Sequence, residues 1–308
     1  MRKMATFIPK EFEEKYSQLL GSEWDEFLRC CKTKIPKSIW INSLKAKPQI
    51  IANDLSKKGW ELSGLFHENA YFLQGVQRPG RSEEFAQGLF NLQEKASMIP
   101  ALALAPQKND LILDAAAAPG NKTLQLSCLM NGSGKIIALE KNVERFKSLR
   151  HNIKKFGMEN VIAKRMDLLD SQKKELFDKI LLDAPCSSEG LVRKDEGALK
   201  NWNEELVQKK SELQKKLIAK SFELLKRNGV MVYSTCSFGP EENEEVVQSV
   251  LETGRAQLER IEIPKFKIRQ GLVQYGNKKF DDSIELCARI YPQDNDTQQF
   301  FVAKIRKK

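Results

Sequence analysis

The sequence predicts an α/β protein: a doubly wound, mostly parallel sheet of seven strands with an antiparallel hairpin at one edge, preceded by a small α+β module. Beyond residue 101, short apolar runs alternate with helical stretches, and this alternation is typical of a parallel sheet. The last two strand candidates are expected to form the antiparallel hairpin at one edge of the sheet. The first hundred residues mix helical and strand patterns without this regularity, so we predict domains at residues 1–100 and 101–308.

Hydrophobic periodicity predicts short elements in the first hundred residues, where we find no repeat and no flexible linker. Together they are enough for a small α+β module. The elements expected are helices at Lys10–Leu20, Trp24–Cys31, Pro48–Lys58 and Ser82–Phe90, a strand at Ser38–Leu44 and a loop at Gly75–Gly80.

The second region supplies the strands and helices of the large sheet. Its strands are apolar runs, as expected of strands that are buried on both faces. Strands are expected at Leu111–Leu113, Lys135–Leu139, Val161–Arg165, Lys179–Leu182, Val230–Ser234, Cys287–Tyr291 and Phe300–Ile305, and helices at Lys122–Met130, Val143–Phe156, Glu204–Arg227 and Glu241–Glu252.

One loop, between Asp114 and Thr123, connects the first of these strands to its helix. It is a run of small residues closed by Pro119-Gly120. A strand, a small-residue loop and a helix let the backbone approach a ligand closely, with helix amides facing it. The spacing fits neither a GxGxxG fingerprint nor a P-loop. A plain strand-to-helix turn is the alternative interpretation.

Acidic residues stand at four successive strand ends. In open α/β sheets, ligands bind beyond the carboxyl ends of the strands. Glu140 is placed to bind a ribose diol, and Asp167 is suited to an exocyclic amine. With Asp114 and Asp183, these residues predict a nucleoside-binding crevice, although ordinary loop acids would give the same pattern.

Two cysteines, Cys186 and Cys236, end neighbouring strands. A thiolate at the crevice can act as a nucleophile if nearby cations or amides lower its pKa, whereas a buried free cysteine is otherwise a small apolar residue. The six cysteines form no CxxC pair and no zinc spacing. With only two histidines, His67 and His151, we expect neither a metal site nor a histidine-based triad.

The net charge of +10 favours a polyanionic partner such as nucleic acid. The sequence contains no run of eighteen apolar residues, so we expect no membrane span. The charged N-terminus lacks the apolar core of a signal peptide. We therefore expect a soluble, cytoplasmic protein, with a monomer as the default state.

Three motifs together resemble the NOP/Sun family of RNA cytosine-5 methyltransferases. They are Asp-Ala-Ala-Ala-Ala-Pro-Gly-Asn-Lys-Thr from Asp114, Asp-Ala-Pro-Cys-Ser-Ser-Glu-Gly from Asp183, and Ser-Thr-Cys-Ser-Phe-Gly-Pro-Glu-Glu-Asn from Ser234. The resemblance implies the Rossmann-like fold of class I methyltransferases, S-adenosylmethionine as cofactor and an RNA substrate. The chain most resembles compact archaeal members that modify tRNA, while the stretch from Arg193 to Trp202 also resembles ribosomal RNA enzymes.

The resemblance also implies roles for single residues. Cys236 would add to carbon 6 of cytosine, and Cys186 would assist loss of the carbon 5 proton and release. Asp183 would bind the cytosine edge, and Lys122 would lie close to cofactor and base, so that these four residues are the expected catalytic set. The target base must leave its stack to reach them. The expected cofactor-binding residues are Ala116, Ala117, Ala118, Pro119, Gly120, Asn121, Lys122, Glu140, Arg145, Asp167 and Asp183.

Some positions depart from the family pattern. Ala115 or Ala116 replaces a loop cysteine, and Asn121 replaces a second glycine, where asparagine tolerates positive φ better than most residues. Trp40 stands where many relatives have arginine, and Asn91 where they often have tyrosine. A non-catalytic RNA-binding or ribosome-assembly factor is one alternative. A DNA cytosine methyltransferase is another, but it would leave Cys236 without a function.

For RNA contact, the first hundred residues are the expected grip, by resemblance. The lysines of Glu204–Arg227 are typical of a solvated helix face with i,i+4 pairs. Arg255–Lys279 is basic and contains Phe266 and Tyr275, a mixture that suits stacking and phosphate contact, although strands flanking the sheet would also explain it. Lys304–Lys308 is expected to be a frayed basic tail.

Overall fold

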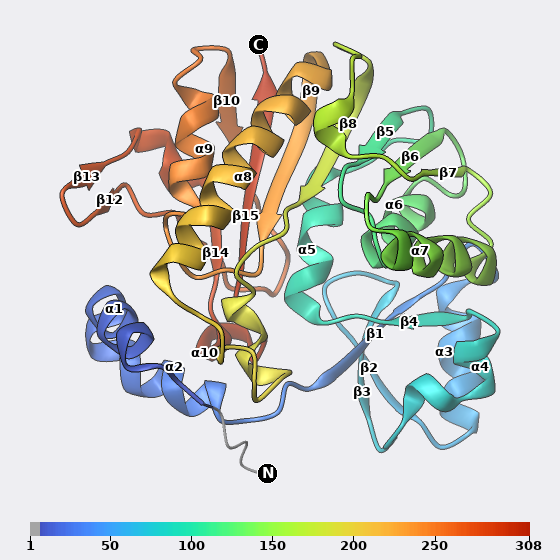
Figure 1. Cartoon of the computed structure of the whole chain (residues 1–308). Helices are drawn as coiled ribbons and strands as arrows, with labels where there is room; N and C mark the ends of the chain where they lie inside the picture. Colours follow the sequence, from blue (N-terminus) through green and yellow to red (C-terminus); the bar gives the residue numbers. More distant parts are fainter. Residues whose placement is uncertain (1–6) are drawn as a thin grey trace.

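A twisted sheet with helices on both faces forms the main body of the molecule (Figure 1). The computed structural model describes residues 7–308. Within these residues the sheet has nine strands in the order β11-β14-β15-β9-β8-β5-β6-β7, with β10 paired to β15. The strands are β5 (Leu111–Asp114), β6 (Lys135–Leu139), β7 (Val161–Lys164), β8 (Phe177–Asp183), β9 (Leu225–Thr235), β10 (Ala256–Glu259), β11 (Arg269–Gln270), β14 (Ala288–Ile290) and β15 (Phe300–Lys307).

The predicted sheet is confirmed, with two additional strands. Five neighbouring strands, from β7 to β9, run parallel, and β15 pairs antiparallel with both β9 and β14. All seven expected strands are present, but the count of seven was too low. The two unpredicted strands, β10 and β11, are short and polar, and their pairing with neighbours far along the chain is what makes them strands.

Alternation of side chains along the strands divides the core between the two faces of the sheet. Ile112 packs in a cluster with helices α5, α6 and α7, while its neighbour Leu113 packs in a second cluster with α8 and α9. Successive strand residues point to opposite faces, so the apolar runs serve both layers. The helices are α5 (Lys95–Leu104), α6 (Asn121–Leu129), α7 (Val143–Phe156), α8 (Glu204–Leu224) and α9 (Glu244–Leu251).

Two helix boundaries differ from the prediction by three residues, while the other differences at these helix ends are single residues. Helix α8 ends at Leu224 rather than Arg227, because Leu225 already pairs with Phe177 as the start of β9. Helix α9 begins at Glu244 rather than Glu241, because the segment after Pro240 forms a turn whose side chains bind the loops beside it. In both places tertiary contacts override the helical propensity of charged residues.

The N-terminal region contains a four-stranded antiparallel sheet in the order β2-β3-β1-β4. Its predicted helix at Ser82–Phe90 was wrong: only Glu83–Ala86 is helical (α4), and Phe90 begins β4. Strands β2 and β3 were not predicted, since they are short and only partly buried. The remaining elements are α1 (Lys10–Leu20), α2 (Trp24–Cys31), β1 (Lys37–Ile41), α3 (Pro48–Lys57), β2 (Glu61–Gly64), β3 (Ala70–Gln74) and β4 (Phe90–Leu92).

Helices α1 and α2 lie apart from this small sheet and against the main body (Figure 1). Phe12 and Tyr16 of α1 pack edge-on against Trp202 and Phe238, with ring centroids 5.2 and 4.7 Å apart for the pairs Phe12–Trp202 and Tyr16–Phe238. Helix α5 crosses the predicted boundary at residue 100 and packs on β8, β9 and β15. The division at residue 100 therefore stays a prediction, because the N-terminal elements share their core with the large sheet.

The C-terminal end of the chain is ordered, and the expected frayed tail at Lys304–Lys308 was wrong. Strand β15 lies between β9 and β10 and continues to Lys307. The Lys307 ammonium is buried and donates to the carbonyl oxygens of Phe222 (3.1 Å) and Leu225 (2.7 Å). A lysine can be buried here because it caps carbonyls at the end of a helix.

Candidate active site

A cavity of about 450 Å³ opens at the carboxyl ends of the parallel strands. It is the place where ligands bind in doubly wound sheets. The loops after β5, β6, β7, β8 and β9 all reach it, so residues from distant parts of the chain meet there. Its lining includes Ala115, Ala116, Glu140, Lys141, Arg145, Asp167, Asp183, Cys186, Lys210 and Cys236.

The two predicted cysteines lie side by side at the wall of this cavity. Cys186 follows β8 and Cys236 follows β9, and their Sγ atoms are 3.2 Å apart. The neighbouring Cys236 and burial raise the pKa of the Cys186 thiol well above its ordinary value. Cys186 is therefore a thiol at neutral pH, and it can share its proton with the sulfur of Cys236.

A lysine–carboxylate pair stands next to the thiols. Lys122, in the first turn of α6, donates to Asp183 Oδ2 at 2.7 Å. Ser234, the residue before Thr235-Cys236, donates to the other oxygen of Asp183 at 2.8 Å. These two donors fix the Asp183 carboxylate at the end of β8, between the cysteines and α6.

A second carboxyl group, Asp114, lies behind the small-residue loop. It is almost completely buried and accepts a 2.7 Å hydrogen bond from the Thr123 hydroxyl. Burial raises the pKa of Asp114 to about 7, with a smaller contribution from the charge of Asp183. Asp114 therefore braces the loop from below, and only its neighbours Ala115 and Ala116 line the cavity.

Two acidic side chains line the far part of the cavity. Glu140 accepts from the Asn142 backbone N–H at 2.8 Å, and Arg145 lies 3.6 Å from its other oxygen. Asp167 accepts from the Leu169 N–H at 3.1 Å. Although burial opposes it, this bond and Lys141 at 3.0 Å lower the pKa of Asp167. Both carboxylates are fixed by contacts within their own loops.

The remaining predicted loop residues lie beside the cavity, and none of Ala117 to Asn121 is part of its lining. Ala117 and Ala118 are buried, and Arg145 donates to the Ala118 carbonyl at 2.5 Å. Gly120 adopts φ 107°, a conformation that suits glycine. Asn121 is the first residue of α6, so the positive φ expected at this turn belongs to Gly120 instead.

Helix α8 contributes cavity residues that the sequence analysis missed. Lys210, Leu213 and Leu217 line the cavity opposite the strand ends. Their three- and four-residue spacing places them on one face of the helix, and this spacing was the available signal. The outer face does carry the expected pairing, with Lys209 3.9 Å from Glu205.

Two family departures lie away from the cavity. Trp40 and Asn91 are buried partners on β1 and β4 of the small sheet. Within residues 7–308, no group of histidine, cysteine and acidic side chains could hold a metal ion. No helix in this described part of the chain has the length and apolar character needed to cross a membrane.

Comparison with known proteins identifies the family. The family described as 16S rRNA methyltransferase RsmB/F matches residues 101–306, and the N-terminal domain of 16S rRNA methyltransferase RsmF matches residues 8–95. A curated relative from Vibrio parahaemolyticus, ribosomal RNA small subunit methyltransferase F, is 37% identical over 98% of this chain. The chain spans 63% of that relative's length.

Two archaeal proteins match over nearly their whole length. The tRNA (cytosine(49)-C(5))-methyltransferase of Pyrococcus abyssi is 38% identical over 97% of this chain and 96% of its own. A solved structure of a methyltransferase homologue from Pyrococcus horikoshii is 32% identical, with a TM-score of 0.84 over 98% of this chain and 96% of its own. The class I methyltransferase fold is confirmed, as is the resemblance to the NOP/Sun family. The chain belongs to the RsmB/F family of methyltransferases.

Proposed function

We propose that the chain is an S-adenosylmethionine-dependent methyltransferase that forms 5-methylcytosine in RNA. The observation that carries this proposal is the pair of thiols, Cys186 and Cys236, 3.2 Å apart at the end of two neighbouring strands. One thiol is enough for a nucleophile. A second thiol in contact with it, at the mouth of a ligand cavity, supports a reaction that needs both a nucleophile and a separate group for release.

Each of the site residues has its own step in the proposed reaction. Carbon 5 of cytosine is a poor nucleophile, so the Cys236 thiolate first adds to carbon 6, and the ring electrons move toward carbon 5. Asp183, held by Lys122 and Ser234, binds the cytosine edge and stabilises its protonated form. When bound, S-adenosylmethionine supplies an electrophilic methyl group for carbon 5. Once Cys186 has lost its own thiol proton, it accepts the carbon 5 proton; the electrons of that bond restore the ring double bond, and the bond from Cys236 to carbon 6 breaks.

The cavity residues fit this cofactor. Ala115 and Ala116 have small side chains, so a ligand can approach the loop backbone closely. Glu140 offers oxygens to ribose hydroxyls, and Asp167 offers one to an exocyclic amine, while Met166 and Leu168 provide apolar surface for a base. We propose that these residues and Arg145 hold the cofactor, with Ala117 to Asn121 shaping the loop from behind.

A basic groove supports RNA as the substrate. It has a volume of about 520 Å³ and lies between the small sheet and the segment after β8. Its exposed cations include Lys34, Arg78, Arg81 and Lys194, and Lys194 comes four positions after Gly190, whose N–H binds the Cys236 carbonyl. The groove therefore leads phosphates toward the thiols. We propose that residues 1–100 bind RNA largely through it.

The predicted stretch Arg255–Lys279 is a weaker candidate for RNA contact. The Phe266 ring packs edge-on against Phe66, with centroids 5.3 Å apart, and Phe266 also borders the core. An aromatic ring packed in this way offers less surface for base stacking. The basic groove, which has no exposed acidic side chain in its lining, is the better site.

We propose tRNA as the substrate, with ribosomal RNA as the alternative. The relative from Pyrococcus abyssi is named for a tRNA cytosine and the relative from Vibrio for small-subunit ribosomal RNA, at 38 and 37% identity. Assays on both RNA classes distinguish them. A cytoplasmic monomer stays a prediction.

The test is methylation of RNA with labelled S-adenosylmethionine by wild type, Cys236→Ala and Cys186→Ala, analysed on a gel that preserves covalent complexes. We expect methylation by wild type, no methylation by Cys236→Ala, and an accumulating protein–RNA band with Cys186→Ala. A band that depends on Cys186 and survives loss of Cys236 would reverse the two roles. A wild type that binds RNA without binding cofactor or methylating any cellular RNA supports a non-catalytic factor, and methylation of DNA alone supports a DNA enzyme.

A further inference from the structure

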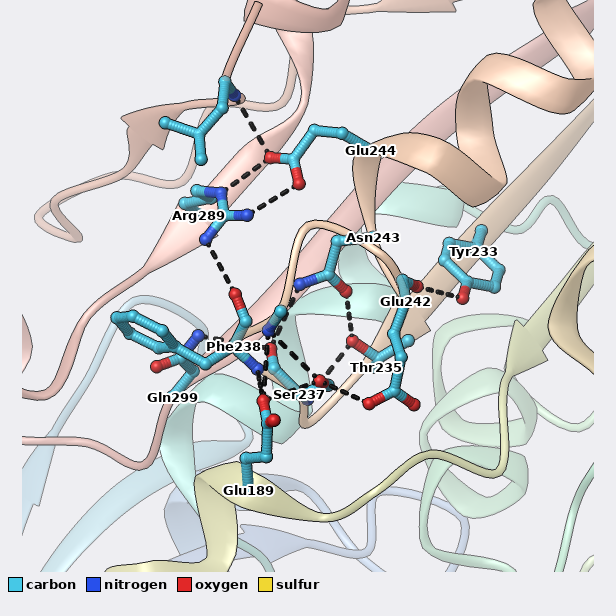
Figure 2. A network of polar contacts seen from close by, with 12 residues as sticks. Glu189, Tyr233, Thr235, Ser237, Phe238, Glu242, Asn243, Glu244, Arg289 and Gln299 are labelled. Atoms are coloured by element: carbon cyan, nitrogen blue, oxygen red, sulfur yellow. Dashed lines mark hydrogen bonds and ion pairs between the residues drawn. The ribbon is translucent and has the colours of Figure 1, made fainter. Parts of the chain in front are cut away.

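Two buried carboxylates, Glu189 and Glu242, bind the segments that follow the two cysteines. Figure 2 shows both of them beside Ser237. Glu189 follows Cys186 by three positions, and Glu242 follows Cys236 by six. Neither carboxylate lines the cavity, and neither has a role in the mechanism above. Burying two carboxylates so close together is costly unless each is fully hydrogen-bonded.

Glu242 binds the residue that follows each cysteine. Its Oε2 accepts from the backbone N–H of Ser187 at 3.0 Å, and its Oε1 accepts from the Ser187 hydroxyl. The same Oε1 lies 2.7 Å from the Ser237 hydroxyl, and Gln214 donates to Oε2 at 2.7 Å. One carboxylate thus connects the loop after β8 to the loop after β9, one residue beyond each thiol.

Glu189 binds the loop after β9 and connects it to helix α1 and to Trp202. It accepts from the backbone N–H groups of Phe238 (2.6 Å) and Gly239 (3.0 Å), and from Tyr16 (2.7 Å) and Trp202 (2.6 Å). These four donors satisfy the carboxylate without help from Ser237, whose hydroxyl lies 2.9 Å away. The Ser237 hydroxyl is therefore free to donate to Glu242.

We propose that Glu242 is a positioning residue that sets the separation of the Cys186 and Cys236 sulfurs through Ser187 and Ser237. The inference rests on the proposed function only in treating these thiols as the reacting pair. Each link is short, buried and charge-assisted, and such hydrogen bonds hold geometry more tightly than neutral ones. Because reaction rates are sensitive to misplacement of about 1 Å, a change behind the loops reaches the chemistry.

A purely electrostatic role for Glu242 makes the opposite prediction. The negative charge of Glu242 is one of the smaller causes that raise the pKa of Cys186, after the bond to Cys236 and burial. Removing the charge alone would release the Cys186 proton more easily and speed thiol reactions. We call the hydrogen bonds from Glu242 to Ser187 and Ser237 the clamp. Removing the clamp separates the two sulfurs and slows any reaction that joins them.

The experiment measures disulfide formation between the two thiols with diamide in the protein alone. The thiols lose two protons and two electrons, a sulfur–sulfur bond forms, and the diazene is reduced to a hydrazine. Peptide mass spectrometry follows the Cys186–Cys236 product. We expect Glu242→Gln to slow its formation by about tenfold. Ser237→Ala, which removes one hydroxyl from the clamp, should slow it in the same direction.

The matched control is Ser211→Ala. Ser211 is also completely buried, and its hydroxyl also binds the loop after β9, at the carbonyl of Glu241, but this hydrogen bond involves neither Ser187 nor Ser237. We expect the disulfide rate of Ser211→Ala to stay within about twofold of wild type, since the lost contact leaves the bonds from Glu242 to Ser187 and Ser237 intact. If Glu242→Gln does not fold, Ser237→Ala decides the result.

An unchanged or faster disulfide rate in folded Glu242→Gln would overturn the proposal, as would an equal slowing in Ser211→Ala. The assay contains neither RNA nor cofactor, so its outcome is independent of whether the protein methylates RNA. Where methylation is observed, Glu242→Gln should lower kcat and leave KM for RNA within about twofold, because the clamp lies away from the basic groove.

Discussion

At the scale of single residues, the site depends on carboxyl groups held in different environments. Asp183 is bonded to Lys122 and Ser234 at the edge of the cavity, whereas Asp114 is buried beneath the loop with Thr123 as its partner. The same residue type therefore serves as an accessible acceptor in one position and a structural brace in the other. Environment assigns these roles, because burial penalises the charged form.

Replacing Asp114 with asparagine should make folding less dependent on pH. In the unfolded chain the Asp114 carboxyl ionises near its ordinary pKa of 3.8, whereas in the folded protein burial raises its pKa to about 7. Between these values the folded state holds the additional proton, so this residue lowers the free energy of unfolding as the pH rises from about 4 to about 7. The full effect is on the order of 4 kcal/mol.

Chemical denaturation at pH 4, 5, 6 and 7 measures this effect. The stability of Asp114→Asn relative to wild type should increase steadily with pH over this range. A difference that is constant from pH 4 to 7 would mean that Asp114 titrates normally in the folded protein.

At the scale of elements, the two cysteine loops approach each other through backbone as well as side chains. Gly190 donates its N–H to the Cys236 carbonyl at 2.7 Å. A Cβ atom at position 190 would lie 2.7 Å from the carbonyl oxygens of both Cys236 and Gln299. Both neighbours are backbone atoms in a buried region, so neither can move aside as the end of a flexible side chain would.

Gly190→Ala should therefore destabilise the fold by about 1–3 kcal/mol and displace Cys236. Thermal denaturation measures the first effect, and the rate of Cys186–Cys236 disulfide formation measures the second. Gly64→Ala is the control, since its Cβ would meet no atom within 4 Å and its φ is not positive. Equal stability of the two variants would show that the loops can separate without cost.

At the scale of the whole molecule, the basic groove joins regions that are distant in sequence. Lys34, Arg78 and Arg81 come from the N-terminal region, and Lys194 comes from the segment after β8. Arg193 ties these parts together: it is buried and donates to the carbonyls of Thr33 (3.1 Å) and Thr297 (2.8 Å). Part of the excess positive charge of the chain thus gathers in one groove beside the segment that follows β8, as the proposed binding of RNA requires.

Replacing Lys34, Arg78 and Arg81 together with glutamine should weaken RNA binding and its dependence on salt. If each cation neutralises one phosphate of a single strand, the slope of log affinity against log salt should fall by about 2. Filter binding or fluorescence anisotropy over a series of salt concentrations measures the slope.

The control for the groove variant replaces three exposed cations near the amino ends of β8 and β9, at the other end of these strands from the cysteines. They are Lys173, Lys174 and Arg227. This control removes the same charge and should leave the slope nearly unchanged. Equal losses in both triple variants would indicate that RNA responds to overall charge rather than to the groove.

Local sequence patterns were sufficient to predict the parallel sheet and the candidate reacting groups. Apolar runs such as the one within Lys135–Leu139 predict strands that are buried on both faces of a sheet. Cys186, Cys236 and Asp183 stand at the ends of such runs, at the edge of the sheet where ligands bind. These are local patterns, readable from neighbouring residues. The family motifs added the expected roles, which stay predictions until the cysteine variants are tested.

The contacts between distant residues could not be predicted and became known from the fold. Strands β10 and β11 exist because partners far along the chain pair with them, and Lys307 is ordered for the same reason. Lys210 became a cavity residue through the orientation of α8, and Glu242 became a clamp through contacts with Ser187, 55 positions away. Such contacts depend on how elements pack, and the pattern within one element does not tell which distant residue it will meet.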